Sequence, residues 1–444
     1  MGKGSLATVL KLTQTINGAS FTSELDANER FGFTPQLSSD GSTLAMLIEK
    51  ITVSLFGGAI VTDYTISLFK KDLTTDQYDT QNVHIFNDIN DYAINNYVLN
   101  STGQFIAISY SKPNNADSKV DIFKHQNDTW VNYGTIQPSQ TNHLIIGWRI
   151  ALSDDGNTIA LGNPYYSEGV FSSGKVFVYE HDLANSQWVK KFEYIGFAGA
   201  AGTAEGGDAL EGGSAGASVS LNGDGTILAI GEPTYPDQKQ GETITRAGRI
   251  SIFKKDNGTW SNVKSKELKG TIPAEELGSD VSLNSDGTIV MIGSYNEGND
   301  SKKKYIFDFN DNTLILKDSF DLDHIILDSN GEQKSAIILK DIAVDNSGTM
   351  VAKVTRTFEG IGYQVTDIKY DISLLEYING AFIKNGEDIS NIIRFDPNLF
   401  GVGGDWWEEL DMLNGISLSG DGKTIAVGSL LHGDHGELKI YRVK

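Results

Sequence analysis

Residues 152–164 read LSDDGNTIALGNP, and a closely similar stretch, LNGDGTILAIGEP, follows at residues 221–233. In both, a short polar run ends in an aspartate-glycine pair, and an apolar run with the composition of a β-strand comes next. Two interpretations compete for the acidic pair. It is either part of a metal or catalytic site, or the turn by which one strand reverses into the next.

The same pattern occurs seven times along the chain. The copies are LSSDGSTLAM (37–46), LNSTGQFIAI (99–108), LSDDGNTIAL (152–161), LNGDGTILAI (221–230), LNSDGTIVMI (283–292), VDNSGTMVAK (344–353) and LSGDGKTIAV (418–427). Their shared glycines are Gly41, Gly103, Gly156, Gly225, Gly287, Gly348 and Gly422. A period of about sixty residues that covers the whole chain indicates a repeat architecture.

Each repeat carries four strand signals, two of which flank the glycine turn. The third alternates clearly in TISLFK (65–70), KVDIFK (119–124), KVFVYE (175–180), RISIFK (249–254), KKYIFD (303–308) and ELKIYR (437–442). The fourth begins at a large apolar residue, namely Tyr78, Trp130, Trp188, Trp260, Leu314 or Phe382. Period-two alternation predicts four-stranded antiparallel sheets. Seven such sheets packed radially bury their faces, so we expect an all-β fold, a seven-bladed β-propeller that forms one domain over residues 1–444.

The two ends of the chain complement each other. The seventh repeat stops at Lys444, just after its third strand, whereas ATVLKLTQTI (7–16) has the alternation of a fourth strand and precedes the first repeat. We therefore expect residues 6–16 to complete the last blade, which closes the ring and leaves no open sheet edge between the first and last blades.

Several repeats add glycines on both sides of the turn. FGFTPQLSSDG (31–41), IGWRIALSDDG (146–156) and LGSDVSLNSDG (277–287) place one before it, and LGNP (161–164) and IGEP (230–233) place one after it. This pattern resembles the FG-GAP repeat, the blade unit of the propeller in integrin α chains. The resemblance covers essentially the whole chain and implies a seven-bladed propeller that serves as a binding or structural platform.

The repeats also decide between the two interpretations of the acidic pair. Integrin-like blades often place a calcium loop in this hairpin, but here Ala151 and Ser153 stand where carboxylates would precede Asp155. The glycine is present in all seven repeats, whereas Thr102 and Ser347 replace the aspartate in two. A turn needs the glycine, and a metal site needs the carboxylate. Calcium is thus possible but not favoured, and we predict a structural turn.

Three further motifs match chemical sites in part. A sialidase Asp box separates Asp from Gly by one residue and ends in tryptophan, unlike these turns. GGSAG (212–216) fits the G-x-S-x-G pattern, but it lies in a Gly/Ala-rich insertion with no helix after it, so we expect a loop. HGDHGE (432–437) groups two histidines with Asp434 and Glu437, a set able to hold a transition metal, at a position where other blades carry ordinary connections. We predict no catalytic residues, no cofactor and no metal site.

The composition limits the partners of the protein. Its formal net charge of -22 repels phosphate groups, which argues against nucleic acid and anionic membrane surfaces. No apolar run approaches the ~18 residues that cross a membrane, so we expect no membrane insertion. The chain contains no cysteine, which excludes disulfides and thiolate sites.

Length variation points to one face of the propeller. The turns between strands 1 and 2 are short and nearly identical, whereas the connections between strands 2 and 3, and between successive blades, vary and carry aromatic residues. Loops that vary on a rigid scaffold commonly carry binding sites. The candidate ligand-binding residues on this loop-rich face are Tyr165, Tyr166, Tyr235, Tyr295, Trp406 and Trp407.

These observations predict a protein that is not an enzyme. We expect a binding or structural propeller, extracellular or displayed on a cell or virion surface, that engages a protein or glycan through the loop-rich face. The alternative is a carbohydrate-active hydrolase or lyase with carboxylates at the central channel. Carboxylates and basic residues that converge at the mouth of the central channel favour the enzyme, and an aromatic or flat lateral patch favours the binding platform.

Overall fold

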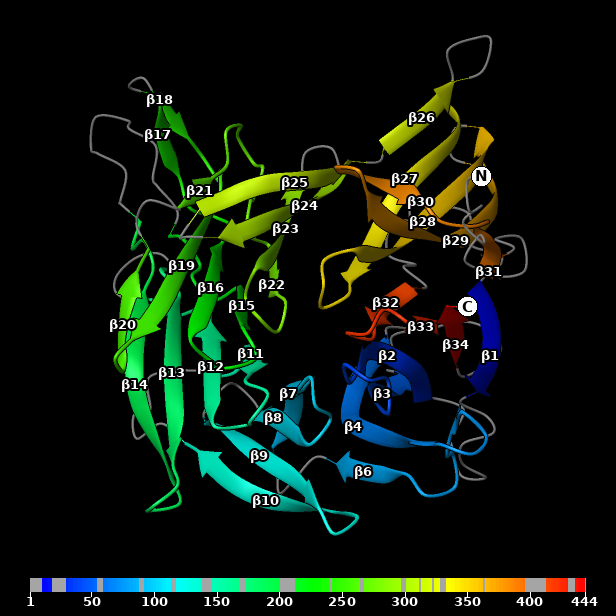
Figure 1. Ribbon diagram of the computed structural model, residues 1–444. Coiled ribbons are helices and arrows are strands. Elements are labelled where there is room, and N and C mark those ends of the chain that lie inside the picture. The colour runs from blue at the N-terminus through cyan, green and yellow to red at the C-terminus, as the bar shows by residue number, and fades with distance from the viewer. Residues whose placement is uncertain are drawn as a thin grey trace, which may run out of the picture. The chain divides into compact units, whose positions relative to one another are not determined.

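The computed structural model describes residues 10–17, 29–53, 59–87, 92–112, 117–137, 146–167, 172–199, 212–239, 242–263, 267–296, 301–310, 313–321, 323–327, 333–361, 364–395, 413–429 and 436–443. These residues contain strands and turns and no helix. The strands form seven antiparallel blades with four-stranded cores, the seven-bladed β-propeller that the sequence predicts (Figure 1). The chain divides into two compact units, one with blades 2 to 5 (Asp88–Ser319) and one with blades 6, 7 and 1 (Met1–Asn87 and Phe320–Lys444).

The unit of blades 2 to 5 follows the predicted repeats closely. Blade 2 contains β7 (Ala93–Leu99), β8 (Phe105–Ser111), β9 (Ser118–Gln126) and β10 (Thr129–Ile136). Blade 3 contains β11 (Arg149–Leu152), β12 (Thr158–Asn163), β13 (Lys175–Asp182) and β14 (Gln187–Ile195). Blade 4 contains β15 (Ser218–Leu221), β16 (Ile227–Glu232), β19 (Arg249–Asp256), β20 (Thr259–Asn262) and β21 (Leu268–Lys269), with β17 (Asp237–Lys239) and β18 (Glu242–Ile244) as a separate hairpin. Blade 5 contains β22 (Asp280–Leu283), β23 (Ile289–Asn296), β24 (Ser301–Asn310) and β25 (Thr313–Asp321).

The other unit departs from the four-strand pattern in two blades. Blade 1 contains β2 (Glu29–Leu37), β3 (Thr43–Val53) and β4 (Ala59–Asp72), and divides its outer strand into β5 (Gln77–Tyr78) and β6 (His84–Asn87). Blade 6 contains β27 (Gln333–Val344), β28 (Met350–Ile361), β29 (Gln364–Ile378), β30 (Ala381–Lys384) and β31 (Ile389–Phe395), and adds β26 (Asp323–Leu327) beside β27. Blade 7 contains β32 (Leu413–Leu418), β33 (Thr424–Ser429) and β34 (Glu437–Val443).

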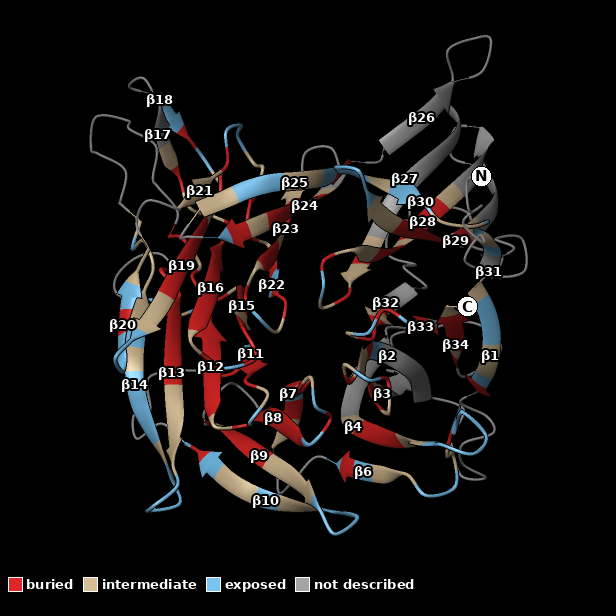
Figure 2. Cartoon of the chain, in the orientation of Figure 1, coloured by how far each residue is buried: buried red, intermediate tan, exposed pale blue. Residues whose placement is uncertain are grey.

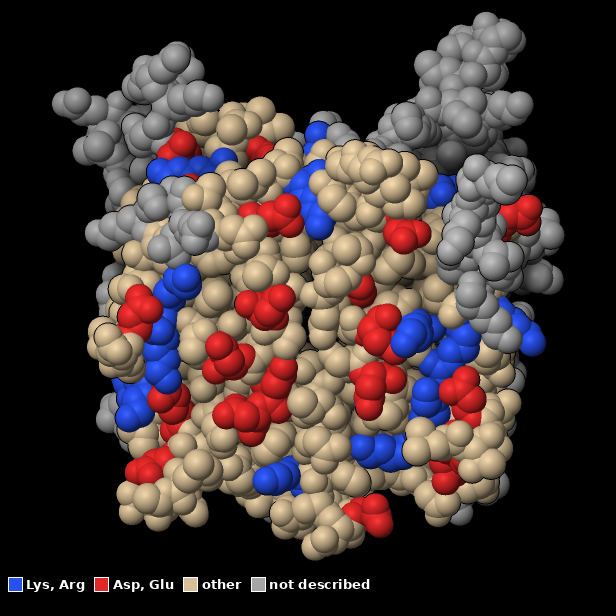
Figure 3. Space-filling model, viewed as in Figure 1, with Lys and Arg blue, Asp and Glu red and all other residues tan. Residues whose placement is uncertain are grey.

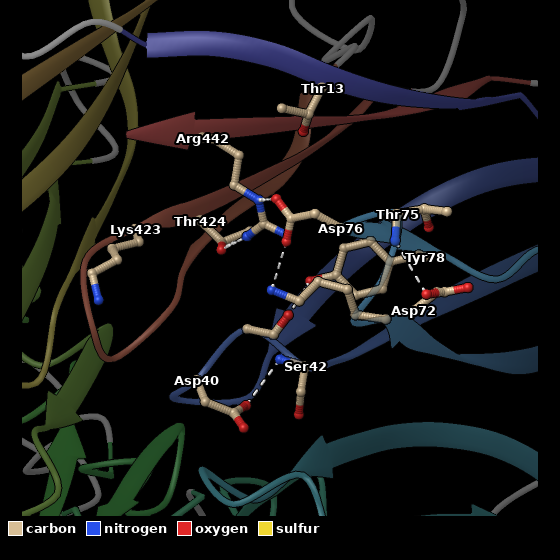
Figure 4. A network of polar contacts seen from close by, with 12 residues as sticks. Thr13, Asp40, Ser42, Asp72, Thr75, Asp76, Tyr78, Lys423, Thr424 and Arg442 are labelled. Atoms are coloured by element: carbon tan, nitrogen blue, oxygen red, sulfur yellow. Dashed lines mark hydrogen bonds and ion pairs between the residues drawn. The ribbon is translucent and has the colours of Figure 1, made fainter. Parts of the chain in front are cut away.

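The N-terminal strand completes blade 7, as predicted. β1 (Leu10–Asn17) pairs antiparallel with β34, from Leu10 opposite Val443 to Asn17 opposite Glu437. Two contacts then tie this blade to blade 1. The Gln14 amide exchanges hydrogen bonds of 2.8 and 2.9 Å with the backbone of Tyr78. The guanidinium of Arg442 lies against the Asp76 carboxylate, with Nε 3.2 Å from Oδ2 (Figure 4).

The core lies between neighbouring blades. Every residue of β8, β12 and β16 is buried, because each of these middle strands is covered on both faces, whereas the outer strand β14 is mostly exposed or half-buried (Figure 2). Each apolar cluster joins two adjacent blades, for example Phe105 and Ile122 of blade 2 with Ile150 and Phe177 of blade 3. The alternation of the strands therefore supplies two apolar faces per blade, as radial packing requires.

The glycines outside the turns are explained by the same packing. A Cβ on Gly162 of blade 3 would lie 2.3 Å from the carbonyl oxygen of Gly216 in blade 4. A Cβ on Gly231 of blade 4 would lie 2.1 Å from the carbonyl oxygen of Gly278 in blade 5. The glycine that follows the turn of one blade thus faces the glycine that precedes the turn of the next blade. The two backbones are in direct contact there, with no side chain between them.

Candidate functional site

The acidic pair of the repeat makes the hydrogen bonds of a turn. Asp155 Oδ1 accepts bonds from the Ser153 hydroxyl at 2.6 Å and the Asn157 N–H at 2.9 Å. Burial by itself raises the pKa of Asp155, but these bonds outweigh it and hold the pKa below its usual value. Gly156 has a φ of +69°, and a Cβ there would lie 2.4 Å from the Phe105 ring. On the face shown in Figure 3, acidic side chains gather over the turns before β12, β16 and β23.

A second position of the turn explains why the aspartate is replaceable. The residue three places before the glycine accepts the backbone N–H that starts strand 2, as Ser153 does from Thr158 at 2.9 Å. In the repeat with Thr102, Asn100 Oδ1 accepts from the N–H of Phe105 at 3.0 Å. All seven repeats hold a buried acceptor here: Ser38, Asn100, Ser153, Asn222, Asn284, Asp345 and Ser419. The same position is polar in every copy of the repeat, a signal that a comparison of the glycine and the aspartate alone misses.

Asp154, the first aspartate of LSDDG, has a different role from its neighbour. Its carboxylate accepts hydrogen bonds from the hydroxyls of Ser101 in blade 2 and of Ser285 in blade 5, the latter at 2.6 Å. Its N–H donates to the carbonyl of Gly223 in blade 4 at 2.7 Å. This one residue therefore joins the turns of four blades, and its carboxylate oxygens are occupied by protein donors.

The inner strands of blades 2 to 5 use small polar residues to bond the next blade. Asn96 Nδ2 donates to the Trp148 carbonyl at 2.8 Å, and the Ser218 hydroxyl donates to the Gly278 carbonyl at 2.8 Å. Both residues stand three places before the leucine that ends their inner strand. The residues at this position in the other two inner strands of the unit are charged: Arg149 in β11 and Asp280 in β22.

Asp280 is paired with a lysine that crosses a strand to reach it. Lys304 of β24 lies opposite Gly293 of β23, which in turn lies opposite Asp280. The Lys304 ammonium contacts Asp280 Oδ2. A Cβ on Gly293 would lie 2.9 Å from the Asp280 Cβ and 3.3 Å from Lys304 Nζ. Because Gly293 has no side chain, the Lys304 side chain has room to cross β23 and reach Asp280 on the inner strand.

The fold does not require a lysine at this place. The second residue of the third-strand motif is a fully buried aliphatic residue in the other five copies: Ile66, Val120, Val176, Ile250 and Leu438. In KKYIFD that position is Lys304, whose side chain is 11% exposed. Desolvating an ammonium is unfavourable, and an apolar residue of similar size serves a core as well or better. A charged residue at this motif position in one copy out of six therefore points to function, and the sequence contained the signal.

Asp280 is both ionised and accessible. Its side chain remains 48% exposed, although the surrounding protein still desolvates it. Desolvation raises its pKa, but the ammonium of Lys304 and, more weakly, the guanidinium of Arg149 outweigh this effect and lower the pKa below its usual value. The site consequently presents a carboxylate with a lowered pKa to solvent beside the Lys304 ammonium.

The predicted aromatic residues have different environments. Tyr165 is 58% exposed, and its ring meets that of Trp148 edge-on at 5.1 Å. Tyr166 lies under the Lys175 ammonium at 4.4 Å and Tyr235 under the Arg249 guanidinium at 3.9 Å, so one face of each ring is covered. Tyr295 is half-buried at the end of β23. Trp406 and Trp407 lie outside the described residues, and the role of all six as ligand-binding residues stays a prediction.

Two of the weaker motifs can be placed. In GGSAG, Ser214 has a φ of +55° and accepts a hydrogen bond from Thr234, and Ala215 bridges to Gly174 ahead of β15, so the segment is the expected loop and no nucleophile elbow. In HGDHGE, His432, Asp434 and His435 lie outside the described residues, and Glu437 binds Lys439.

Within the described ranges, no three His, Asp or Glu side chains are grouped as metal ligands. The same ranges contain no helix that is long and apolar enough to cross a bilayer.

The similarity of this chain to known proteins is distant. No family model and no curated protein matches the sequence. Among solved structures, a Bacteroides uniformis protein provisionally named 6-phosphogluconolactonase is 12% identical, with 87% of this chain and 89% of that chain covered and a TM-score of 0.45. An oligogalacturonate lyase in complex with manganese is 12% identical (100% and 99% covered, TM-score 0.49). The β-propeller domain of the Trilobed protease of Pyrococcus furiosus, described as having an open velcro topology, is 9% identical (94% and 97% covered, TM-score 0.46).

These comparisons correct one prediction. We expected a protein that is not an enzyme, because the blades are regular and carry no familiar catalytic motif. Structures that share the architecture are named as a lactonase, a lyase and a protease, which contradicts that expectation. At 9 to 12% identity and with TM-scores below 0.5, the likeness assigns no reaction to this chain.

Proposed function

We propose that this propeller is a carbohydrate-active enzyme, a hydrolase or lyase, with Asp280 as its catalytic carboxylate. The observation that supports it is the Asp280–Lys304 pair, which replaces the buried aliphatic residue of the other copies and keeps an ionised carboxylate accessible on the loop-rich side. Glycosidic bonds are cleaved with carboxylates that act as base or nucleophile, and cations beside them stabilise the developing negative charge.

Each residue has a separate part in this proposal. Asp280 accepts a proton or attacks the sugar, and its lowered pKa keeps it ionised at neutral pH. Lys304 holds that charge in place and orients the carboxylate through their direct contact. Gly293 is a positioning residue, because it leaves room for the Lys304 side chain. Polar groups at strained or costly positions are commonly retained for function.

The test is a screen of the purified protein for bond cleavage in a panel of neutral and acidic polysaccharides, read as new reducing ends or as absorbance from unsaturated products. We expect at least one substrate, and a loss of about 100-fold or more in kcat/KM with Asp280→Asn, within the range seen for general base residues. Asp308→Asn is the matched control, since Asp308 faces Lys317 in the same blade at 3.5 Å, on the outer strands. It should leave the rate unchanged.

Lys304→Met separates function from stability. Methionine restores an apolar residue at a position where five other copies have one, and Asp280 retains water on its exposed side. The variant should unfold at an equal or higher urea concentration than wild type while turnover falls. Unchanged turnover in either Asp280→Asn or Lys304→Met, or no cleavage of any polysaccharide by the wild type, contradicts the proposed function.

A further inference from the structure

We propose that Arg149, Trp148 and Tyr165 of blade 3 form a subsite for a sugar ring that carries a carboxylate. This inference rests on the proposed function for the class of ligand, and it names the substrate of that same site. The three residues lie at the start of β11 and in the connection after β12, on the loop-rich side of the blade. Each offers a group that the described protein leaves unused.

Arg149 is exceptional among the arginines of its unit. Blades 2 to 5 contain three arginines, and the other two bind carboxylates: Arg246 binds Glu276, and Arg249 binds Glu232 at 2.8 Å. Within the described ranges, Arg149 has no carboxylate within ion-pair distance. It is exposed, and its Nη1 donates to the carbonyl of Trp148 at 3.3 Å. In a chain with a net charge of -22, an arginine that remains unpaired is available to an external anion.

The position of Arg149 also breaks the pattern of its neighbours. Asn96 and Ser218, which hold the same position in the inner strands of blades 2 and 4, use their side chains to bond the backbone of the next blade. Arg149 does not serve the blade junction in this way, and its Nη1 bonds the carbonyl of the adjacent Trp148 instead. Arg149 and Asp280 open the two inner strands, β11 and β22, that contact β15, so a ligand carboxylate bound to Arg149 lies on the same side of these strands as the proposed catalytic carboxylate.

The aromatic pair supplies the surface for a sugar ring. Tyr165 is 58% exposed, and its backbone N–H is held by Asn163 Oδ1 at 3.2 Å, which fixes the residue at the end of β12. Trp148 packs edge-on against it at 5.1 Å. Among the described residues, neither the Tyr165 hydroxyl nor the Trp148 indole N–H has a hydrogen-bond partner. Exposed aromatic faces stack on the C–H groups of sugars, and these polar edges can bond their hydroxyls.

The combination selects a uronic-acid type of residue. A guanidinium binds a carboxylate with two parallel hydrogen bonds, and an adjacent ring holds the sugar. Charge neutralisation by Arg149 also acidifies the C–H next to that carboxylate. In an elimination, this proton passes to Asp280, its electron pair forms the C=C bond, the C–O bond to the leaving sugar breaks, and a solvent proton goes to the leaving oxygen. The subsite thus favours a lyase among the two reactions proposed.

The test measures binding in the Asp280→Asn protein, in which turnover does not consume the ligand. The probes are oligosaccharides of glucuronic, galacturonic and mannuronic acid and their carboxyl-reduced, neutral counterparts, titrated calorimetrically. We expect at least one acidic probe to bind about tenfold more tightly than its neutral counterpart, a factor typical of one charged contact. Arg149→Gln should abolish that preference, and Tyr165→Ala should weaken both forms alike. Arg246→Gln, which removes a paired arginine, is the control and should change neither.

The outcomes separate this inference from the proposed function. Equal binding of acidic and neutral probes, or a preference that survives Arg149→Gln, overturns the subsite, even if the wild type cleaves neutral glycans through Asp280. A carboxylate preference that depends on Arg149 supports the subsite even when no substrate is cleaved, and then only the catalytic proposal fails. Binding of sulfated probes in place of carboxylated ones also overturns it.

Discussion

The contact between glycines of adjacent blades gives the sharpest test of how this propeller is held together. Gly231 of blade 4 does not have a positive φ, so alanine is compatible with its backbone conformation. The alanine Cβ, however, would lie 2.1 Å from the Gly278 carbonyl oxygen and 2.2 Å from the Ser218 hydroxyl. Ordinary contact requires a separation of more than 3 Å, so blades 4 and 5 have to move apart by about 1 Å at this point.

The expected loss has two parts. Forcing a methyl group into a packed junction costs about 1–3 kcal/mol. The Ser218 hydroxyl also loses its 2.8 Å hydrogen bond to the Gly278 carbonyl, which contributes about 1 kcal/mol. We therefore expect Gly231→Ala to lower the free energy of unfolding by about 2–4 kcal/mol. For a cooperative unit of the size of blades 2 to 5, that corresponds to a fall in Tm of roughly 5–15 °C.

Differential scanning calorimetry and urea denaturation measure both quantities. The matched control is Gly380→Ala, because Gly380 has a φ of +92° and no atom within 4 Å of its Cβ position. This variant carries backbone strain without a clash and should lose about 1 kcal/mol. If Gly231→Ala is no less stable than Gly380→Ala, close approach of the blades is not the reason for the glycine, and the packing explanation of the repeat is wrong.

Two further predictions concern the closure of blade 7 and the acidic turns. Arg442→Met, which removes the contact with Asp76 at 3.2 Å, should lower the free energy of unfolding by roughly 2 kcal/mol in urea denaturation; a change below about 0.5 kcal/mol contradicts a role in joining blades 7 and 1. The pKa values of Asp40, Asp155 and Asp421 are lowered because, despite the opposing effect of burial, hydrogen bonds from turn hydroxyls and N–H groups favour the ionised form. Their stabilisation is complete above the usual carboxyl pKa of about 4 and disappears as the pH falls through the lowered values. A variant with asparagine at all three positions should therefore lose less Tm between about pH 6 and pH 3 than wild type, and an identical pH profile contradicts the assignment.

The sequence by itself determined the architecture. Seven copies of one pattern, each with four alternating strands, leave radial packing as the way to bury both faces of every sheet, and β1 pairs with β34 where the unfinished last repeat required a strand. Comparison of the copies also showed which residue of the acidic pair the turn needs. The turn and the Phe105 ring both require Gly156. Asp155 supports the turn, but the repeats that contain Asn100 and Asp345 form the same turn without an aspartate before the glycine. Local patterns determine local structure, because turns and strands depend on neighbours in sequence.

The candidate site depends on contacts between residues that the sequence leaves far apart. Asp154 joins turns from four blades, and Lys304 reaches Asp280 only because Gly293 stands between them without a side chain. The third-strand motif marked Lys304 as an exception, but its partner and the accessibility of Asp280 follow from the sheet register and the position of β22. Likewise, nothing in the sequence distinguishes Arg149 from Arg246 and Arg249, because pairing with a carboxylate is a property of the folded surroundings. Repetition specifies the scaffold many times over, whereas a site is made once, by side chains that meet only when the blades are assembled.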